Sequence, residues 1–260
     1  GCINNSSRKI MRKFKFDWDK DGKVEYMTLW SPYDEEMSKT QIAEIFADED
    51  YKWGLDYIKT KKDAVVVDLG ACMGTSAIYF KDFAKTVYAI EPSSKPYECL
   101  VENTKEFPNI KTFRHAIMHE NKPIPLYTND TGPVPDSIFG NGKISELVQA
   151  KTLEKFMEDN KVEHIDLLKM DIEGSEYMIL PSAGFAKVAD KVDMIVGEAH
   201  YFGEVRPEYL PEILKEYGFT VEFLPKKNMF KVLTYTDPET GKEKSYKIWF
   251  NTIFKAYKNE

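Results

Sequence analysis

Cysteine is scarce in this chain, and long apolar runs are missing. The 260 residues include three cysteines, Cys2, Cys72 and Cys99, without paired or CxxC spacing. This excludes a disulfide framework and a cysteine-rich zinc site, and it favours a reducing, intracellular (cytoplasmic) setting. No apolar stretch approaches the length of a membrane span, and no signal-peptide core opens the chain, so we expect no transmembrane segment.

Basic charge is also in deficit. There are 36 Lys and Arg residues against 43 Asp and Glu, which gives a net charge of -7. This balance argues against broad binding to nucleic acid. With 14 Gly and 13 Pro, a collagen-like or low-complexity chain is excluded, while 42% hydrophobic and 13% aromatic residues can fill a large core. The length fits one large α/β domain with a small appendage.

The first 60 residues predict a tail, a hairpin and a helical cap, with a single domain over residues 61–260. Residues 1–12 are expected to form a basic solvated tail; Gly1 and Cys2 resemble a dual-acylation leader, but Asn5 stands where Ser or Thr is needed. The cap is too small for its own core and is expected to cover the domain that follows. Its aromatic residues offer flat faces that are expected to lie over a substrate there (Trp30, Tyr33, Tyr51 and Trp53).

Within this segment, residues 13–16 and 24–29 predict a hairpin closed by an Asp-Gly turn. The intervening residues also match the first half of a calcium loop, although Thr28 stands where a bidentate Glu is required, so the hairpin is favoured. Residues 38–60 predict a helix capped by Ser38 or Thr40.

From residue 63 onward, strand and helix patterns alternate. This favours a mostly parallel, doubly wound sheet with helices on both faces, and a late strand pair without a helix between implies an antiparallel edge strand. The pattern predicts strands at 64–68, 86–90, 111–117, 165–170, 192–196, 219–224 and 248–255, and helices at 75–83, 93–105, 152–160, from 174, and 207–217. Glycine and proline predict a loop at 129–143 and a turn at 235–244.

A glycine-rich turn follows the first of these strands. In Asp68-Leu69-Gly70-Ala71-Cys72-Met73-Gly74-Thr75, Gly70 permits a sharp turn and Gly74 a close approach to a ligand, while the next helix presents its N–H groups. Glu91 ends the second strand, where an acidic side chain can bind both ribose hydroxyls. These residues predict a nucleoside cofactor at the carboxyl ends of the strands.

Two cofactor classes fit this pattern. A dinucleotide would require glycine where Cys72 and Thr75 stand, and the loop has no positive charge for a pyrophosphate. Asp68 would repel phosphate but suits a cation, so electrostatics favours S-adenosylmethionine, which carries a sulfonium and an ammonium. A glycine-rich turn without any ligand is disfavoured because Glu91 stands at the matching place.

Two further strand ends carry polar side chains. The segment Lys169-Met170-Asp171-Ile172-Glu173-Gly174-Ser175-Glu176 places three carboxylates after an apolar strand. Stabilisation of a helix N-terminus explains one or two of these acidic residues, but it explains Asp171 less well. In the next strand, Glu198 and His200 share a face, and a His beside a carboxylate is a candidate base. His115, with Ala116, ends the third strand and is expected near the adenine, whereas His119 and His164 are expected at the surface.

The chain resembles the FkbM family of S-adenosylmethionine-dependent methyltransferases. Three segments carry the resemblance, Val67 to Ala71, Ala89 to Pro92 and Asp166 to Glu176, and it extends over about residues 62–202. Cys72 departs from the family, which usually has Asn there. The resemblance implies a seven-stranded, Rossmann-like methyltransferase sheet and methyl transfer to a hydroxyl, commonly of a sugar.

On this reading, the acceptor hydroxyl attacks the sulfonium methyl, with alignment supplying most of the rate. We predict His200 as the base, near its unperturbed pKa, with Glu198 and Asp171 orienting it or the sugar; the same three side chains are a possible site for a divalent metal. The rival hypotheses are a methyltransferase acting on RNA or protein and a non-catalytic nucleoside-binding module. The predicted cofactor-binding residues are Asp68, Gly70, Ala71, Gly74, Thr75, Glu91, Pro92, Ser93, His115, Ala116 and Asp171.

Overall fold

The computed structural model describes residues 12–20, 23–127, 143–201, 206–224, 230–236, 243–249 and 251–258. The tail up to residue 11, the Asp-Gly turn, residues 129–142 of the predicted loop and residues 237–242 of the predicted late turn lie outside these ranges. The strand and helix bounds below therefore refer to the described part of the chain.

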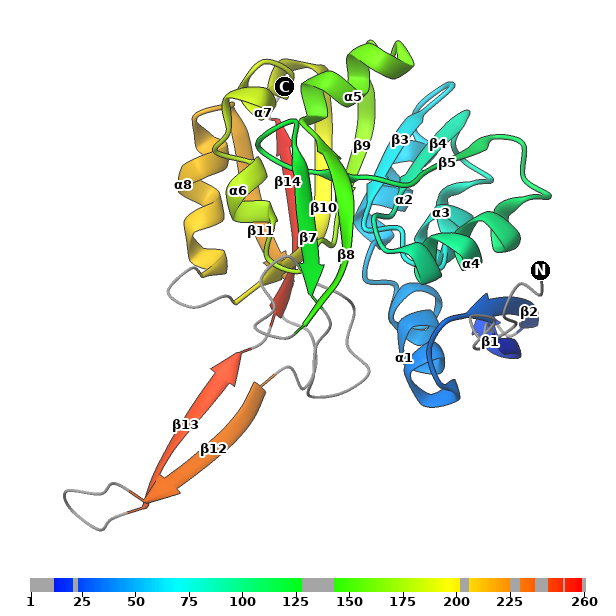
Figure 1. Ribbon diagram of the computed structural model, residues 1–260, viewed down its shortest axis with the longest axis vertical. Helices are drawn as coiled ribbons and strands as arrows, with labels where there is room; N and C mark the ends of the chain where they lie inside the picture. The colour runs from blue at the N-terminus through cyan, green and yellow to red at the C-terminus, as the bar shows by residue number, and fades with distance from the viewer. Residues whose placement is uncertain are drawn as a thin grey trace, which may run out of the picture.

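A seven-stranded sheet forms the centre of the molecule, in the order β11-β14-β10-β9-β3-β4-β5 (Figure 1). Its strands are β3 (Val65–Leu69), β4 (Thr86–Ile90), β5 (Ile110–Phe113), β9 (Ile165–Met170), β10 (Val192–His200), β11 (Phe219–Leu224) and β14 (Asn251–Lys258). All pair in parallel except β14, which is antiparallel to both β10 and β11.

The predicted fold class is thus confirmed, with one correction. The antiparallel strand β14 is not at the edge of the sheet, because β11 pairs along its outer side. The chain passes from β11 to β14 through a separate antiparallel hairpin, β12 (Phe230–Thr236) with β13 (Glu243–Trp249), which projects from the body in Figure 1.

Helices cover both faces of this sheet. They are α1 (Glu35–Phe46), α2 (Lys52–Lys59), α3 (Thr75–Phe80), α4 (Ser94–Thr104), α5 (Leu153–Asn160), α6 (Glu176–Ile179), α7 (Ala183–Ala186) and α8 (Leu210–Lys215), with the 3-10 turns η1 (Ala189–Lys191) and η2 (Pro207–Tyr209). The predicted helices after 174 and over 207–217 are therefore shorter and broken. Thr152 and Ser93 precede α5 and α4 as N-caps rather than first-turn residues.

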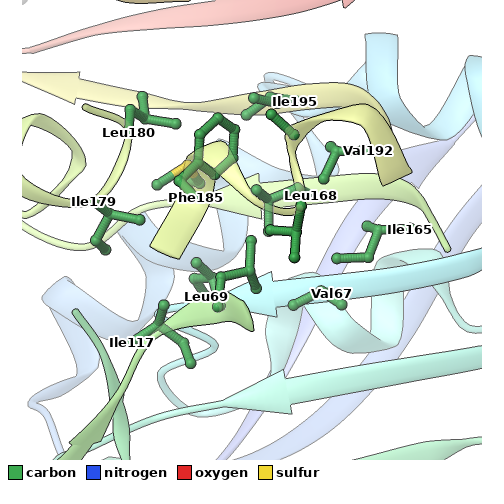
Figure 2. Close-up of a cluster of buried hydrophobic side chains, with 14 of the residues drawn as sticks. Val67, Leu69, Ile117, Ile165, Leu168, Ile179, Leu180, Phe185, Val192 and Ile195 are labelled. Atoms are coloured by element: carbon green, nitrogen blue, oxygen red, sulfur yellow. The ribbon is translucent and has the colours of Figure 1, made fainter. Parts of the chain in front are cut away.

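The two faces contribute to two hydrophobic clusters. Successive β3 residues alternate between them, since Val66 packs with α1–α4 while Val67 and Leu69 pack on the opposite face. Figure 2 shows Val67 and Leu69 among Leu168, Phe185 and other side chains from β9, β10 and the helices beyond. Strands buried on both faces explain the continuous apolar runs in the sequence.

The N-terminal segment packs directly on the sheet. Strands β1 (Arg12–Lys20) and β2 (Lys23–Ser31) form an antiparallel hairpin that confirms the predicted pairing. Asp17 and Asp19 lie within β1, opposite residues of β2, so the calcium-loop alternative is wrong. The boundary at residue 60 stays a prediction, while Ile42, Leu55 and their neighbours share one hydrophobic cluster with β3 and α3.

The single helix predicted over 38–60 is in fact α1 and α2, with a break after Phe46. Asp34 caps α1, because its Oδ1 accepts from the Met37 N–H at 2.9 Å. Neither Ser38 nor Thr40 is the cap; the Ser38 hydroxyl instead lies 2.7 Å from that of Ser31.

A small second sheet was absent from the sequence prediction. It has the order β6-β8-β7, with β6 (Ala116–Ile117), β7 (Pro123–Tyr127) and β8 (Ile144–Lys151). The strand predicted over 111–117 is divided between β5 and β6. Pro123 and Pro125 within β7, and the polar composition of β8, concealed these strands.

One side chain ties the N-terminal hairpin to the glycine-rich turn. Asn103 of α4 accepts from the Trp30 N–H at 2.7 Å and donates to the Trp30 carbonyl at 2.8 Å. Its amide also donates to the Met73 carbonyl at 2.8 Å. Asn103 therefore links β2, α4 and the turn after β3.

We expect Asn103→Ala to lower the free energy of unfolding by about 2–4 kcal/mol, because three hydrogen bonds are lost and their backbone partners are partly buried. Urea denaturation measures this change. Lys105→Ala, which removes an exposed ion pair with Glu102 on the same helix, is the control and should cost less than about 0.5 kcal/mol. Equal effects of the two substitutions would contradict the linking role of Asn103.

Candidate functional site

The turn after β3 has the geometry predicted for Gly70. Gly70 has φ +74°, and a Cβ there would lie 1.8 Å from the Asp171 carbonyl oxygen, so the turn needs glycine. The Gly70 and Ala71 N–H groups both donate to the Ile90 carbonyl at 3.0 Å. Gly74 has φ +93°, and a Cβ there would meet Leu100 of α4. The expectation that Gly74 permits a close approach to a ligand is therefore wrong; this glycine permits close packing against α4.

Glu91 follows β4 and is held by the same turn. One carboxylate oxygen accepts from the Cys72 N–H at 3.0 Å, and the other from the Ser93 N–H at 2.8 Å. Each oxygen keeps a second lone pair for a ligand hydroxyl. Burial raises the pKa of Glu91 to about 7, and the two backbone N–H groups lower it only in part.

A buried ammonium group lies beneath the turn. Lys169 of β9 is 1% exposed, and its Nζ forms an ion pair with Asp68 Oδ1 at 3.1 Å. Nζ also donates to the carbonyls of Gly70 at 2.8 Å and Leu69 at 3.3 Å. The other Asp68 oxygen accepts from Ser76 at 2.6 Å. Burial alone would lower the pKa of Lys169, but the charges of Asp68 and Asp171 raise it.

The loop after β9 gathers carboxylates around His200. The ring Nδ1 lies 3.3 Å from Glu176 Oε1, while Nε2 lies 3.7 Å from Glu173 Oε2 and 3.9 Å from Asp171 Oδ1. Glu173 has a left-handed φ of 54°, an uncommon conformation for a residue with a side chain. Burial raises the pKa of Glu173 to about 7, with further raising by Asp171 and Glu176 against the lowering by His200.

These carboxylates change the protonation of His200. Burial alone would lower the pKa of His200, but the charges of Glu176, Glu173 and Glu198 raise it well above the usual value. The expectation of an imidazole near its unperturbed pKa is therefore wrong for the free protein. A raised pKa favours the protonated ring, whose Nδ1 lies within hydrogen-bond distance of Glu176 alone, and a protonated ring is unsuited to accept the hydroxyl proton.

Asp171 is the carboxylate that connects this cluster to the rest of the site. Its Oδ2 accepts from the Tyr51 hydroxyl, at 3.0 Å, and Tyr51 itself is 4% exposed. Burial, and then the charge of Asp171, raise the pKa of Tyr51 well above its usual value, so the phenol stays protonated as a donor. Asp171 is thus fixed in orientation.

A cavity of about 800 Å³, a volume that includes its open mouth, runs along these strand ends. Its walls combine apolar side chains, among them Ile90 and Ile117, with the carboxyl groups of Glu91, Asp171 and Glu173. The predicted site residues that line it are Gly70, Glu91, Pro92, Ser93, His115, Ala116 and Asp171. These positions are therefore brought together as the sequence predicted.

The other predicted site residues do not line the cavity. Asp68, Ala71 and Thr75 are buried beneath it, and Gly74 packs on α4. Glu198 and His200 share a face of β10 and lie close to Asp171; one ligand atom from each of the three lies within 4.8 Å of the others. This arrangement could hold a divalent cation.

Sequence reasoning missed five prominent residues of the cavity wall; Tyr33, which it placed among the covering aromatic residues of the cap, also lines the cavity. Glu173 was within the acidic motif, and its position there was the signal that could have found it. Leu126 and Met118 depend on the unpredicted β6–β8 sheet. The five are Gln41, Cys72, Met118, Leu126 and Glu173.

The comparisons with known proteins bear on this geometry. The FkbM methyltransferase domain matches residues 68–221, more than half of the chain. The chain belongs to the FkbM methyltransferase family. No curated protein matches it.

Solved structures with similar folds include other methyltransferases. An S-adenosylmethionine-dependent methyltransferase from Agrobacterium tumefaciens is 10% identical, with a TM-score of 0.53 over 97% of this chain and 72% of that chain. A precorrin-6y C5,15-methyltransferase from Geobacter metallireducens (15% identity, TM-score 0.43, 80% and 86% covered) and an rRNA methylase from Streptococcus thermophilus (10%, 0.45, 81% and 97%) are also similar.

This FkbM protein is an S-adenosylmethionine-dependent methyltransferase. Within the described ranges, none of its helices has the length and apolar character needed to span a bilayer. The donor set of the cavity fits the cofactor: an apolar slot suits adenine, the Glu91 carboxylate suits the ribose hydroxyls, and the carboxylates beyond suit a cation. We assign Glu91 to the ribose as a proposal.

We expect Glu91→Ala to weaken S-adenosylhomocysteine binding by about tenfold or more, because a charge-assisted hydrogen bond to the ribose is lost. Isothermal titration calorimetry measures this. Binding at wild-type strength would refute the assignment of Glu91 to the ribose.

The same ligand supplies a pH test. With a pKa of about 7 in the free protein, Glu91 gains a proton as the pH falls, and a protonated carboxyl cannot accept from both hydroxyls. Affinity should therefore fall by about tenfold between pH 8 and pH 6 in the wild type. Glu91→Gln, which does not titrate, should show a weaker and flatter profile; identical slopes would assign the pH dependence to another group.

Proposed function

We propose that this FkbM methyltransferase transfers the methyl group to a hydroxyl of a sugar, in a glycan or a glycosylated small molecule. The observation that supports it best is the chemistry of the cavity wall. Beyond Glu91, the wall carries Asp171, Glu173, Tyr33 and Gln41, which are hydrogen-bonding groups suited to hydroxyls. Tyr33 also adds an aromatic face on which a sugar ring can stack.

The charge of the wall favours this acceptor over RNA. Among the described residues that line the cavity, none is Lys or Arg. Recognition of an RNA backbone depends on positive side chains near the phosphates, and the net charge of -7 points the same way. A cytoplasmic location is part of the proposal, since Cys72 and Cys99 are free thiols.

The proposed reaction is an in-line displacement. The acceptor oxygen forms a bond to the methyl carbon while the carbon–sulfur bond breaks, the electron pair stays on sulfur, and the hydroxyl proton leaves. Alignment of oxygen, carbon and sulfur supplies most of the rate. We propose Asp171 as the catalytic residue that orients the hydroxyl and accepts its proton, because Asp171 alone of the predicted catalytic residues lines the cavity.

His200 and Glu198 then act through Asp171. The imidazolium lies 3.9 Å from Asp171 Oδ1, and both side chains belong to the same cluster of potential ligand atoms. They are positioning residues in this proposal. In the alternative, a divalent cation held by Asp171, Glu198 and His200 would supply a Lewis acid for the hydroxyl oxygen.

The experiment that tests the acceptor class offers the wild-type protein a panel of sugars and glycans beside RNA and protein substrates, with and without a chelator. S-Adenosylhomocysteine release should follow the sugar hydroxyl substrates. Transfer to RNA or protein with inert sugars would replace the proposal by the rival acceptor. Cofactor binding without transfer to any substrate would favour a non-catalytic module, and restoration by Mg²⁺ after chelation would support the metal.

We expect Asp171→Asn to lower kcat by about 10²-fold or more, because the amide cannot accept the hydroxyl proton. S-Adenosylhomocysteine affinity should change by less than about tenfold, the value of one charge-assisted bond. Steady-state kinetics and calorimetry give the two values.

Asp193→Asn is a matched control for Asp171→Asn. Asp193 also accepts from a tyrosine hydroxyl, that of Tyr57, at 3.0 Å, but it lies at the start of β10, whereas Asp171 follows the end of the parallel strand β9. The kcat of the control variant should stay within about twofold of the wild-type kcat. A kcat for Asp171→Asn close to that of the control would leave alignment alone as the source of the rate.

A further inference from the structure

Tyr51 brings the N-terminal segment into direct contact with the proposed catalytic residue. Its hydroxyl donates to Asp171 Oδ2 at 3.0 Å, although the two residues are 120 positions apart in the sequence. The side chain of Tyr51 is buried, and Tyr51 is not among the residues that line the cavity. A ring buried in this way offers no face to a substrate, so any effect of Tyr51 on the reaction passes through the hydroxyl group.

The packing of helix α2 on the sheet fixes the position of Tyr51. Tyr51 is the N-cap of α2, and Leu55 on the same helix is buried. Gly54 lies so close to the sheet that a Cβ there would come within 2.8 Å of Leu167 of β9 and 3.1 Å of Val196 of β10. Because protein interiors are close-packed, a helix at this distance cannot shift without displacing core side chains. The hydroxyl of Tyr51 is therefore held at a defined place beside the end of β9.

The aromatic ring of Tyr51 contacts the ammonium group that lies beneath the glycine-rich turn. Lys169 Nζ lies 5.5 Å from the ring centroid, which is a cation–π distance. The same Nζ lies 4.0 Å from Asp171 Oδ2, the oxygen that accepts from the Tyr51 hydroxyl. One oxygen of the Asp171 carboxylate therefore faces both the phenol and the ammonium.

The second oxygen of Asp171 lies on the side of His200, with Oδ1 3.9 Å from His200 Nε2. The torsion that sets the plane of an aspartate carboxylate has a broad energy minimum, so the plane has to be fixed by neighbouring groups. A base also needs a lone pair within hydrogen-bond reach of the proton that it accepts. A donor on Oδ2 meets this requirement, because it fixes the direction in which Oδ1 points.

We propose that Tyr51 is a positioning residue for methyl transfer, which holds the Asp171 carboxylate in the plane in which it accepts the proton of the acceptor hydroxyl. The proposal rests on the role proposed above for Asp171. Tyr51 precedes residue 68, where the match to the FkbM domain begins, so the active site of this chain extends beyond the matched domain. The N-terminal segment then contributes to the chemical step, in addition to any part that it takes in covering the acceptor.

Tyr51→Phe tests this role, because it keeps the buried ring and removes only the hydroxyl. With the sugar that gives the fastest S-adenosylhomocysteine release as the acceptor, we expect kcat to fall by about tenfold, since the loss of one charge-assisted hydrogen bond misaligns the carboxylate. The acceptor KM and the S-adenosylhomocysteine affinity should stay within about twofold of the wild type. A fall in kcat without these other changes identifies an effect on the chemical step; an unchanged kcat would overturn the proposal.

Tyr57→Phe is the matched control. Tyr57 lies on the same helix, and its hydroxyl also donates to a carboxylate at 3.0 Å, that of Asp193. The control therefore removes the same kind of hydrogen bond from α2 at a place that does not line the cavity, and its kcat should stay within about twofold of the wild type. Equal losses of kcat in the two variants would overturn the proposal, because they would mean that α2 supports the site only as a whole.

A double-mutant cycle shows whether Tyr51 acts through Asp171. In the Asp171→Asn background the carboxylate that Tyr51 positions is gone, so adding Tyr51→Phe should change kcat by less than about twofold. A further tenfold loss in that background would overturn the proposal, because Tyr51 would then act on another group.

A crystal structure of Tyr51→Phe, compared with crystals of the wild type, tests the positioning without any acceptor. We expect the Asp171 carboxylate to leave its wild-type plane, and a carboxylate that keeps this plane would overturn the proposal even if kcat falls. Failure of every sugar would overturn the proposed acceptor alone, with the methylated RNA or protein then serving in the kinetic comparison. A wild type that binds the cofactor but transfers no methyl group would overturn the catalytic role of Asp171 together with this proposal.

Discussion

The buried ammonium of Lys169 is the group on which the site depends. It pairs with Asp68 across adjacent strands and donates to the carbonyls of Leu69 and Gly70, so one charge fixes both the strand end and the turn that follows it. A buried ion pair of this kind contributes little net stability, since desolvation offsets much of the attraction. Its effect here is to determine the conformation: Gly70 approaches Asp171 so closely that no side chain could be accommodated.

Because the turn is fixed, the functional groups of several strands meet in one place. The turn presents the Cys72 N–H to Glu91 from β4, and it sets the Gly70 backbone against Asp171 from β9. Carboxylates so concentrated would repel one another without compensating cations, and the structure places Lys169 beneath them and the His200 ring, with its raised pKa, beside them. The high pKa of His200 is the consequence of this compensation, which sequence reasoning about an isolated histidine could not foresee.

The parallel sheet and its strand ends could be predicted from the sequence. Continuous apolar runs such as Ile165–Met170 indicate buried parallel strands, and the residues that follow such strands lie at one edge of the sheet. Glu91, Asp171 and His115 were found in this way. Tyr33 was expected over the acceptor site because of its aromatic ring, but Gln41 and Leu126 were not found, because they reach the cavity only through tertiary packing of the cap and the small sheet. The order of β14 and β11 depended on a long-range pairing that no local pattern encodes.

The balance of charge in the cavity also affects the rate of methyl transfer. S-Adenosylmethionine is a cation whose positive charge on sulfur disappears in the reaction, and a carboxylate at about 4 Å attracts a unit charge by about 4 kcal/mol at an effective dielectric constant of 20. Such attraction favours the substrate over the neutral product, which assists exchange, but any part of it lost at the transition state raises the barrier. Asp171 lies 4.0 Å from Lys169 Nζ and accepts from Tyr51, and Glu173 lies 3.7 Å from the His200 ring, so these two carboxylates would exert a weaker field on the sulfonium than bare ones. In the proposed reaction, the cationic groups around the acidic loop would therefore allow the site to select a cationic cofactor without holding its charge too strongly for methyl transfer.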